Sequence, residues 1–321
     1  MLRLLLSRKD LNVNRVTSER LYGRPVHEVH PNLRGFTDLK FSRIQDMEGG
    51  DVLFLALPHG NSQKMIEKLR RDHDKIIDLS ADYRLSSKEV YRKWYGTQHL
   101  DPDNLGSFIY GIPEIHRGEI SSASTVAGPG CIAAASILAL YPFRFHAKRV
   151  LIDAKIGSSA AGNTANSSTH HPERSGVIRP YAPVSHRHEA EIRQETGLDV
   201  SLTVSAVEMV RGISATIHMD MDQDFNESEA WKKLRNCWNE EPFIRFVKSR
   251  KGIYRYPEPK LVAGTNLCDI GFEWDGDHSR LVVFSCIDNL VKGAAGSAIQ
   301  SMNLMIGVDE CEGLLYPGLH P

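Results

Sequence analysis

The hydrophobic positions in the first part of the chain alternate between short strand-like runs and helix-like segments. Residues 51–57 (DVLFLAL) form a continuous apolar run, and residues 75–79 (KIIDL) are interpreted as another short buried strand. Runs of this kind are typical of strands that are buried on both faces of a sheet. A strand is also expected over 11–16, and a helix from Ser62, as its cap, to about Arg71. This succession of strands and helices predicts a parallel, doubly wound α/β sheet.

From about residue 150 the pattern changes to apolar and polar residues that alternate with a period of two. Two helices are expected here, near 186–196 and over 227–239, among five strand-like segments: VLIDAKIG, SLTVSAVEMV, GISATIHMDM, CDIGFEW and RLVVFSCI. The pattern predicts a mixed or antiparallel sheet and therefore an α+β second part. Residues 293–306 are small and apolar at helical spacing, which suits packing against another element. We place the boundaries at 1–130, 131–292 and 293–321.

Composition and charge narrow the class of protein. At 321 residues the chain is long enough for two packed domains. Lysine and arginine number 39 against 40 acidic residues, so no global charge points to a nucleic-acid partner. No apolar run approaches the roughly 20 residues that cross a membrane, and we expect no membrane partner. The five cysteines form no CxxC pair, so we expect a reducing cytoplasm and no disulfide framework.

Cys131 is the strongest candidate for chemistry. It follows a Gly-Pro-Gly turn at 128–130 and precedes the small, apolar stretch 132–140, which predicts a helix. At a helix N-terminus the free amide groups and the helix dipole favour a thiolate and lower the pKa of the cysteine. The same amides could stabilise an oxyanion on a bound carbonyl group. The alternative is a buried structural cysteine, which is the role that we expect for Cys237, Cys268, Cys286 and Cys311.

Histidines and arginines concentrate in the segment 170–193. It holds four of each: His170, His171, His186, His188, Arg174, Arg179, Arg187 and Arg193. Histidine is the side chain best suited to move a proton near neutral pH, and arginine binds phosphate or carboxylate oxygens in a bidentate fork. A thiolate with such a cluster suits acyl-phosphate chemistry. Two other interpretations are a metal site, although the spacing matches no common zinc pattern, and a solvated polar loop with incidental histidines.

Three further segments are candidates for binding a cofactor. Residues 157–162 (GSSAAG) and 292–296 (KGAAG) consist mostly of tiny residues, which let a backbone approach a ligand closely. Either segment could equally be a turn or the start of a helix. Residues 17–20 (TSER) follow a predicted strand, and Arg20 could bind the 2′-phosphate that distinguishes NADP from NAD.

Taken together, the segments resemble the N-acetyl-gamma-glutamyl-phosphate reductase family, within the aspartate-semialdehyde dehydrogenase-like group. The matching stretches are VHEVHPNLRG, LALPHGNS, DLSADYRL, YGIPEIHR, AGPGC, DAKIGSSAAG, HRHEAEI, MVRGI and DNLVKGAAGSAIQSMNLM. The stretch SSTHHPERSGVIRPY looks most like the lysine-biosynthesis branch. The resemblance implies a Rossmann-like NADP-binding domain over 1–130, an aspartate-semialdehyde dehydrogenase-like catalytic and dimerisation domain over 131–292, and a helix within 293–321 that returns to the first domain.

The resemblance also implies roles for individual residues. Cys131 would be the nucleophile and His188 the general acid and base in an NADPH-dependent reduction of an acyl phosphate to a semialdehyde through a thioester. The cofactor NADPH would meet Thr17, Ser18, Arg20, Gly157, Ser158, Asn289, Lys292 and Gly293. The substrate would meet Arg174, Arg179, Tyr181, His186 and Arg187. No metal ligand is implied.

In the lysine-biosynthesis branch the substrate is attached to a small acidic carrier protein. The resemblance therefore implies a carrier-bound aminoadipyl or glutamyl phosphate in lysine or arginine biosynthesis, with Arg174, Arg179 or their neighbours as a basic rim for the carrier. The alternative substrate is free N-acetylglutamyl phosphate. Proteins of this kind commonly form dimers and tetramers, so a homodimer or homotetramer is expected.

The chain departs from the family pattern at its start. The family opens with a strand and a glycine-rich turn that seats the cofactor pyrophosphate on a helix N-terminus, whereas this sequence begins with MLRLLL, within the helix that should follow. We therefore expect the sheet to lack a central strand. Either the start lies upstream of Met1, or this form binds NADPH poorly, or the chain is a non-catalytic binding or assembly protein.

Overall fold

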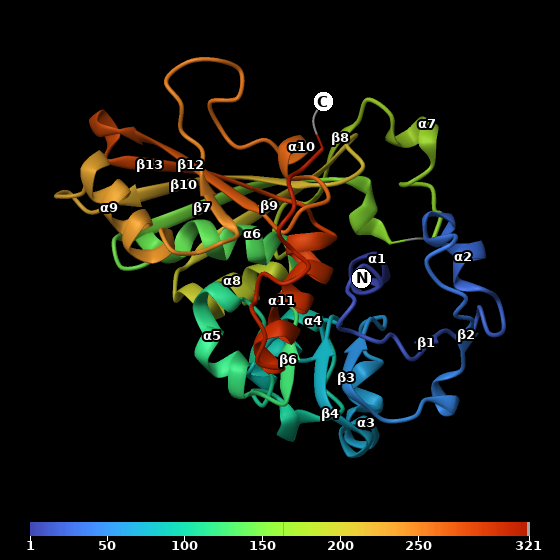
Figure 1. Cartoon of the computed structure of the whole chain (residues 1–321). Helices are drawn as coiled ribbons and strands as arrows, with labels where there is room; N and C mark the ends of the chain where they lie inside the picture. Colours follow the sequence, from blue (N-terminus) through green and yellow to red (C-terminus); the bar gives the residue numbers. More distant parts are fainter. Residues whose placement is uncertain (163, 320–321) are drawn as a thin grey trace.

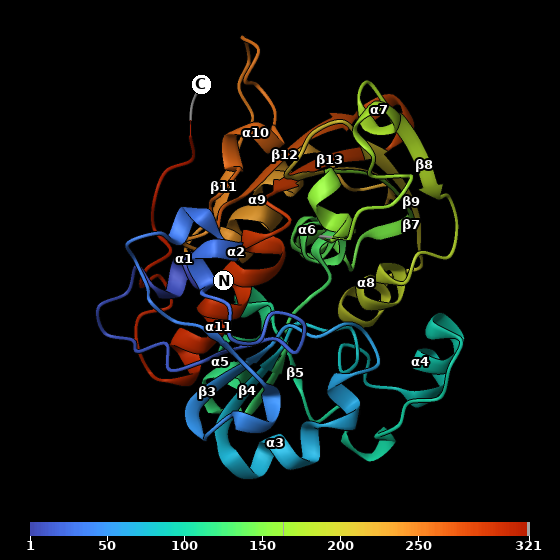
Figure 2. The same ribbon diagram turned by 90° about the vertical axis from the view of Figure 1, so that its right-hand side faces the viewer.

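The computed structural model describes residues 1–162 and 164–319 and contains two sheet-based parts. Figure 1 shows a large sheet at the top and a smaller one below it. Three helices lie between the sheets in this view and in Figure 2: α6 (Cys131–Leu140), α8 (His188–Thr196) and α11 (Gly296–Met305).

The smaller sheet has four parallel strands in the order β3–β4–β6–β5, which confirms the predicted parallel sheet. They are β3 (Gly50–Leu55), β4 (His73–Asp78), β5 (Ile109–Tyr110) and β6 (Thr125–Ala127). Ile76 and Ile77 of the inner strand β4 are almost wholly buried, as an apolar run between two covered faces predicts. By contrast β3 lies at the edge of this sheet, so Val52, Leu53 and Phe54 are only half-buried, and the expectation of burial on both faces was wrong there.

The N-terminal segment forms a separate unit. It contains α1 (Leu2–Leu5), β1 (Val16–Thr17), α2 (Val26–Val29) and β2 (Phe41–Ser42), and β1 pairs with β2 in a two-stranded parallel sheet. In the described part of the chain no strand joins this pair to β3. The strand predicted over 11–16 was wrong except at Val16, because no neighbouring strand pairs with the preceding residues.

The helix predicted to start at Ser62 begins later. Residues 62–64 form a 3₁₀ turn, and α3 (Ile66–Asp72) follows it. Ser62 is wholly buried, and its hydroxyl donates to Asp78 Oδ1 at 2.8 Å instead of capping a helix. Two more helices complete this part, α4 (Lys88–Tyr95) and α5 (Pro113–Ser122).

The larger sheet is mixed, as predicted, and has seven strands in the order β11–β12–β13–β10–β7–β9–β8. Their bounds are β7 (Ala147–Ile156), β8 (Ile178–Ala182), β9 (Val200–Val207), β10 (Ile213–Met221), β11 (Ile244–Phe246), β12 (Cys268–Asp275) and β13 (Arg280–Ile287). The pairs β7–β9 and β11–β12 are parallel, and the other neighbours are antiparallel. Along β10, Ile213, Ala215 and Ile217 are buried and alternate with partly exposed residues, so one face of the sheet forms the core.

Helices cover this inner face. The apolar helix α6 packs against it in one large cluster that also includes Ile192 of α8 and Leu234 of α9 (Glu227–Trp238). Two short helices, α7 (His171–Arg174) and α10 (Pro259–Val262), lie outside this layer in Figure 1. After β13 the chain forms a π-helical turn at Val291–Ala295 and then α11. Ala298, Ile299 and Met302 of α11 pack in one cluster with Ile77 of β4, so the end of the chain contributes to the core of the first part.

Candidate active site

Cys131 is the first residue of α6, as the sequence predicts, and follows directly on β6 and the Gly-Pro-Gly turn. The turn is tied to the parallel sheet because the Gly128 amide donates to the Asp78 carbonyl at 2.7 Å. The Gly128 carbonyl in turn accepts from Arg84 Nε at 2.9 Å. The cysteine is therefore held at the carboxyl edge of the parallel sheet, at the junction with the second part of the chain.

His188, the first residue of α8, lies against the same turn. A Cβ atom added at Gly130 would lie 2.5 Å from His188 Nε2 and 2.8 Å from Glu191 Oε1. Only glycine leaves room for the imidazole at this distance from the residue before Cys131. The fold thus brings the predicted nucleophile and the predicted acid–base residue to one turn.

Glu191 anchors this arrangement and was not predicted. Its carboxylate is wholly buried and accepts from the Gly130 amide at 2.8 Å and from the Tyr110 hydroxyl at 2.7 Å. Arg84 Nη1 lies 3.4 Å from its other oxygen, and His188 Nε2 lies 3.9 Å from that oxygen. The signal in the sequence is the HEAE spacing, since residues three apart share one face of a helix.

Burial dominates the electrostatics of Cys131. Cys131 is half-buried, and the loss of water around its thiol raises the pKa to about 11, although Arg84 and the Ile132 amide at the start of α6 act in the opposite direction. The prediction that the helix N-terminus gives Cys131 a lowered pKa was therefore wrong in its net sign. Near neutral pH the thiol is protonated before a ligand arrives.

The two histidines of the site are neutral near pH 7. Burial lowers the pKa of His186 to about 4, with a further contribution from Arg187. Burial also holds the pKa of His188 well below its ordinary value, with contributions from His186 and two arginines. His188 Nδ1 is buried without a hydrogen-bond partner among the described residues. A neutral imidazole of this kind can accept a proton from the thiol.

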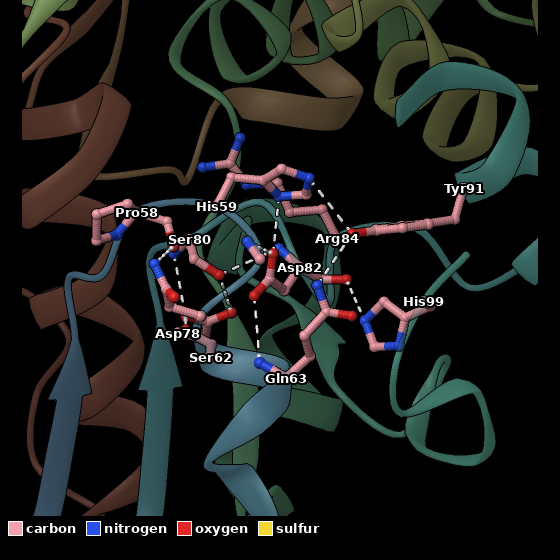
Figure 3. Close-up of polar contacts among 12 residues, drawn as sticks. Pro58, His59, Ser62, Gln63, Asp78, Ser80, Asp82, Arg84, Tyr91 and His99 are labelled. Atoms are coloured by element: carbon pink, nitrogen blue, oxygen red, sulfur yellow. Dashed lines mark hydrogen bonds and ion pairs between the residues drawn. The ribbon is translucent and has the colours of Figure 1, made fainter. Parts of the chain in front are cut away.

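A second buried carboxylate, Asp82, organises the loops after β3 and β4 (Figure 3). It accepts from the Gly60 amide at 2.6 Å and the Gln63 amide at 3.2 Å, and it lies 2.7 Å from His59 Nδ1. The His59 ring stacks on Tyr95, with ring centroids 4.4 Å apart. These contacts account for the PHGNS and SADYR motifs: they fix the loops beside Arg84.

Comparison with known proteins identifies the family. Residues 1–123 match the family model described as semialdehyde dehydrogenase, NAD binding domain, and residues 131–289 match the one described as semialdehyde dehydrogenase, dimerisation domain. The chain belongs to the semialdehyde dehydrogenase family. It is therefore an oxidoreductase with a nucleotide-binding first domain, and the resemblance drawn from its motifs is confirmed.

Relatives that match over the whole chain are named as phosphate reductases. A Deinococcus radiodurans protein named LysW-L-2-aminoadipate 6-phosphate reductase is 48% identical over 326 aligned positions, which cover 100% of this chain and 94% of the relative. A Nitrosopumilus maritimus relative, named for both the LysW-L-2-aminoadipate and LysW-L-glutamate phosphates, is 46% identical over 333 residues, with 100% and 95% coverage. The crystal structure of aspartate semialdehyde dehydrogenase II from Vibrio cholerae has a TM-score of 0.71 at 16% identity, over 95% of this chain and 94% of that one, and shows the shared fold.

The residues predicted to meet the cofactor lie in two places on the protein. Thr17, Ser18 and the exposed Arg20 are at the end of β1 and just beyond it. The others surround the ends of β7 and β13, and their side chains are largely engaged within the protein. Asn289 accepts from the Gly212 amide at 2.8 Å and donates to Ser159 Oγ at 3.0 Å.

The two small-residue loops have packing roles of their own. A Cβ at Gly157 would lie 2.7 Å from the Val210 carbonyl oxygen, and the Ser158 amide donates to Met209. A Cβ at Gly293 would lie 2.6 Å from Cys131 Cβ. Lys292 is buried in an ion pair. A ligand at this end of the site would therefore meet the backbone of 292–293 and not the ammonium group.

The residues predicted to meet the substrate also form two groups. Some lie near Cys131, and others bond to backbone carbonyl groups. Tyr181 and His186 lie near the cysteine: their ring centroids are 6.1 Å apart, and Cys131 contributes to the raised pKa of Tyr181. Arg187 is exposed next to them. By contrast Arg174 donates to the Val207 carbonyl and Arg179 to the Glu173 carbonyl, so both brace the loop that carries them.

The described residues contain neither a cluster that could hold a metal ion nor a helix that could cross a membrane. In residues 1–162 and 164–319 no group of three or more histidine, cysteine or acidic side chains could hold a metal ion. Within those same ranges no helix is long and apolar enough to cross a membrane.

The raised pKa of Cys131 predicts the pH dependence of its alkylation. Because the thiolate forms only as the pH approaches about 11, the rate of reaction with iodoacetamide at this residue should rise about tenfold per pH unit between roughly pH 7 and pH 9. The rate is measured by mass spectrometry of the Cys131 peptide. A plateau already reached below pH 8 would show a thiolate that the helix amides stabilise.

The contact between Gly130 and His188 predicts the effect of a single methyl group. Gly130→Ala should lower kcat about 100-fold, because the new Cβ displaces the imidazole from the turn. Gly118→Ala is the matched control, since no atom lies within 4 Å of the added Cβ in helix α5, and its activity should be unchanged. Equal activity of the two variants in a steady-state assay would contradict the arrangement.

Proposed function

We propose that this protein reduces an acyl phosphate to an aldehyde through a thioester on Cys131, with NADPH as the reductant. The observation that carries the proposal is the turn at 128–131. It places a thiol at the N-terminus of α6, against a neutral His188 whose helix also carries the buried Glu191 carboxylate. Such an arrangement suits nucleophilic catalysis at a carbonyl group.

The residues of the chain supply the steps of acylation. His188 accepts the thiol proton, the sulfur bonds to the acyl carbon, and the carbon–oxygen bond to the phosphoryl group breaks as phosphate leaves. Glu191, 3.9 Å from His188 Nε2, stabilises the imidazolium that forms. The first amides of α6 have no partner within their helix and can donate to the oxyanion.

Reduction of the thioester completes the reaction. NADPH, when bound, would supply the hydride that reduces the acyl carbon. The carbon–sulfur bond then breaks, the aldehyde leaves, and the Cys131 sulfur recovers its proton from His188. The protein returns to the neutral thiol and neutral imidazole that its buried site favours.

NADPH, not NADH, is proposed from the residues beyond β1. The parallel strands share one carboxyl edge, which is where dinucleotides bind in doubly wound sheets. Ser18 and the exposed Arg20 lie just beyond the end of β1, where the 2′-phosphate of NADP would need a cation. Thr17 completes this proposed phosphate contact, and the backbone of Gly157, Ser158 and Gly293 lines the proposed nicotinamide end.

The proposed substrate is aminoadipyl or glutamyl phosphate attached to a small acidic carrier protein. The support is the identity of 46% and 48%, over the whole chain, with relatives whose names contain LysW-linked substrates. The exposed Arg187 beside the site suits an acidic partner better than Arg174 and Arg179, whose guanidinium groups bond to backbone carbonyls. Free N-acetylglutamyl phosphate is the alternative substrate.

A homodimer or homotetramer is proposed for the assembly. The second part of the chain matches a family model described as a dimerisation domain. Its sheet also keeps one face open: Leu151 of β7 points away from the core and is 40% exposed. An open sheet face of this kind suits contact with a second copy.

Acylation predicts a covalent mass change on one residue. Incubation with acyl phosphate in the absence of NADPH should add the acyl group to Cys131, because the thioester then has no route to reduction. Cys131→Ala should lose both the adduct and the turnover, whereas Cys237→Ala, in α9, should keep both. Turnover that persists in Cys131→Ala would exclude the thioester route.

The nature of the substrate predicts a dependence on salt. Carrier-bound aminoadipyl phosphate should be reduced with a higher kcat/KM than free N-acetylglutamyl phosphate. Only the carrier-bound reaction should weaken as salt rises from roughly 0.05 M to 0.5 M, because screening acts on the charged protein surfaces. Steady-state kinetics on both substrates test this. A higher kcat/KM for the free substrate would favour the alternative.

A further inference from the structure

Lys292 is one of the most deeply buried charged side chains of the protein. It is 1% exposed, and its ammonium nitrogen lies 2.5 Å from Glu114 Oε1 and 2.8 Å from Gln300 Oε1. The ammonium also lies 5.4 Å from the centre of the Phe243 ring. A charge placed this far from water is tolerated only when a partner of opposite charge is held beside it.

Glu114 depends on the same contact. Burial opposes ionisation of its carboxyl group, but the Lys292 ammonium outweighs that effect and holds the pKa of Glu114 below its ordinary value. The second oxygen, Oε2, has no hydrogen-bond partner among the described residues. Gln300 Nε2 is a weaker neighbour at 3.2 Å. Without Lys292, therefore, a buried carboxylate would lose its main compensation.

The pair joins segments that are far apart in the sequence. Glu114 is at the start of α5 in the first part of the chain, and Lys292 is in the π-helical turn after β13. A chain of polar contacts extends outward from the pair: Gln300 to Glu310 at 2.8 Å, Glu310 to Arg117 at 2.8 Å, and Arg117 to Glu241 at 2.6 Å. The pair is thus the inner end of a network across the junction of the two parts.

Each residue of the pair is close in the sequence to a residue that contacts the candidate active site. The residue after Lys292 is Gly293, whose backbone packs so closely on Cys131 that an added Cβ would lie 2.6 Å from Cys131 Cβ. Four residues before Glu114 is Tyr110, whose hydroxyl donates to the buried Glu191 at 2.7 Å. Single π-turns often mark functional sites, and this one touches the nucleophile.

We propose that the Lys292–Glu114 ion pair has a positioning role. It holds the turn at 291–295 against Cys131 and docks the first part of the chain against the catalytic cysteine. This role rests on the proposed function and deepens it. Lys292 and Glu114 act through the backbone of Gly293 and through α5. The ammonium does not bind the cofactor.

A double-mutant cycle tests the proposal. Lys292→Met and Glu114→Gln should each lower kcat at least tenfold with KM changed less than threefold, and each should lower the melting temperature. The double variant should be more active than either single variant, because no charge is then left buried alone. It should stay below the wild-type kcat, since the turn is no longer drawn onto Cys131.

Alkylation of Cys131 provides a readout that needs no substrate. Release of the turn should expose the thiol, so iodoacetamide should react at least threefold faster in each single variant than in the wild type. Asp269→Asn is the control: it breaks the ion pair between the buried Asp269 and the exposed Arg245 near the outer edge of the large sheet, and should lower stability without changing kcat or alkylation. If no protein, wild type included, reduces acyl phosphates, the proposed function fails while alkylation still tests the positioning role.

Three outcomes would overturn the proposal. In the first, the double variant is no more active than Lys292→Met. In the second, the dissociation constant for NADPH rises in Lys292→Met but not in Glu114→Gln, which would make Lys292 a cofactor ligand. In the third, stability falls while kcat and Cys131 alkylation stay at wild-type values. If the single variants do not fold, the double variant decides: wild-type kcat and alkylation in it would leave the pair a purely structural role.

Discussion

The active site depends on one buried carboxylate, that of Glu191. A carboxylate removed from water is stable only when donors replace its hydration. Here the donors come from three separate segments: the Gly130 amide, the Tyr110 hydroxyl and the Arg84 guanidinium. Since Arg84 and Tyr110 belong to the first part of the chain and Glu191 to the second, the compensation is complete only when the two parts are docked. Assembly of the fold and assembly of the site are therefore one event.

Two opposing electrostatic effects meet at Cys131. The start of α6 and Arg84 favour the thiolate, whereas the surrounding protein favours the neutral thiol and prevails. The neighbouring His188 is subject to the same bias, because burial favours its neutral form. A thiol and an imidazole that are both neutral at rest form their ion pair only when a ligand alters the site. This couples nucleophile activation to substrate binding, and a protonated thiol is also slow to oxidise.

The sequence patterns succeeded where structure is decided locally. The period-two segments became β7, β9, β10, β12 and β13, and Cys131 is indeed the first residue of its helix. The patterns gave wrong or missing predictions where the structure of a segment depends on a partner that is distant in the sequence. Residues 11–15 lack a strand to pair with, whereas 178–182 pair with β9 and form an edge strand that their composition did not indicate. The roles of Glu191 and Arg84 were missed for the same reason: the HEAE spacing places Glu191 on the helix face of His188, but the partners of Glu191 and Arg84 lie up to 107 residues away. The pairing of Lys292 with Glu114 could not be predicted either, since nothing local in the sequence reveals it.

Two glycines, which have no side chain, allow the close contacts that hold Cys131 in position. Gly130 precedes it and lets His188 and Glu191 approach from one side, and Gly293 packs on its Cβ from another. Any larger residue at either position would move the imidazole or the turn by a distance comparable to the reach of a proton transfer. Close approach at Gly130 is maintained by the Glu191 hydrogen bond, and close approach at Gly293 by the ion pair of the residue before it. The two buried carboxylates are connected by one short segment, 110–114: Tyr110 at its start donates to Glu191, and Glu114 is its last residue. Through this segment both carboxylates affect the position of the nucleophile.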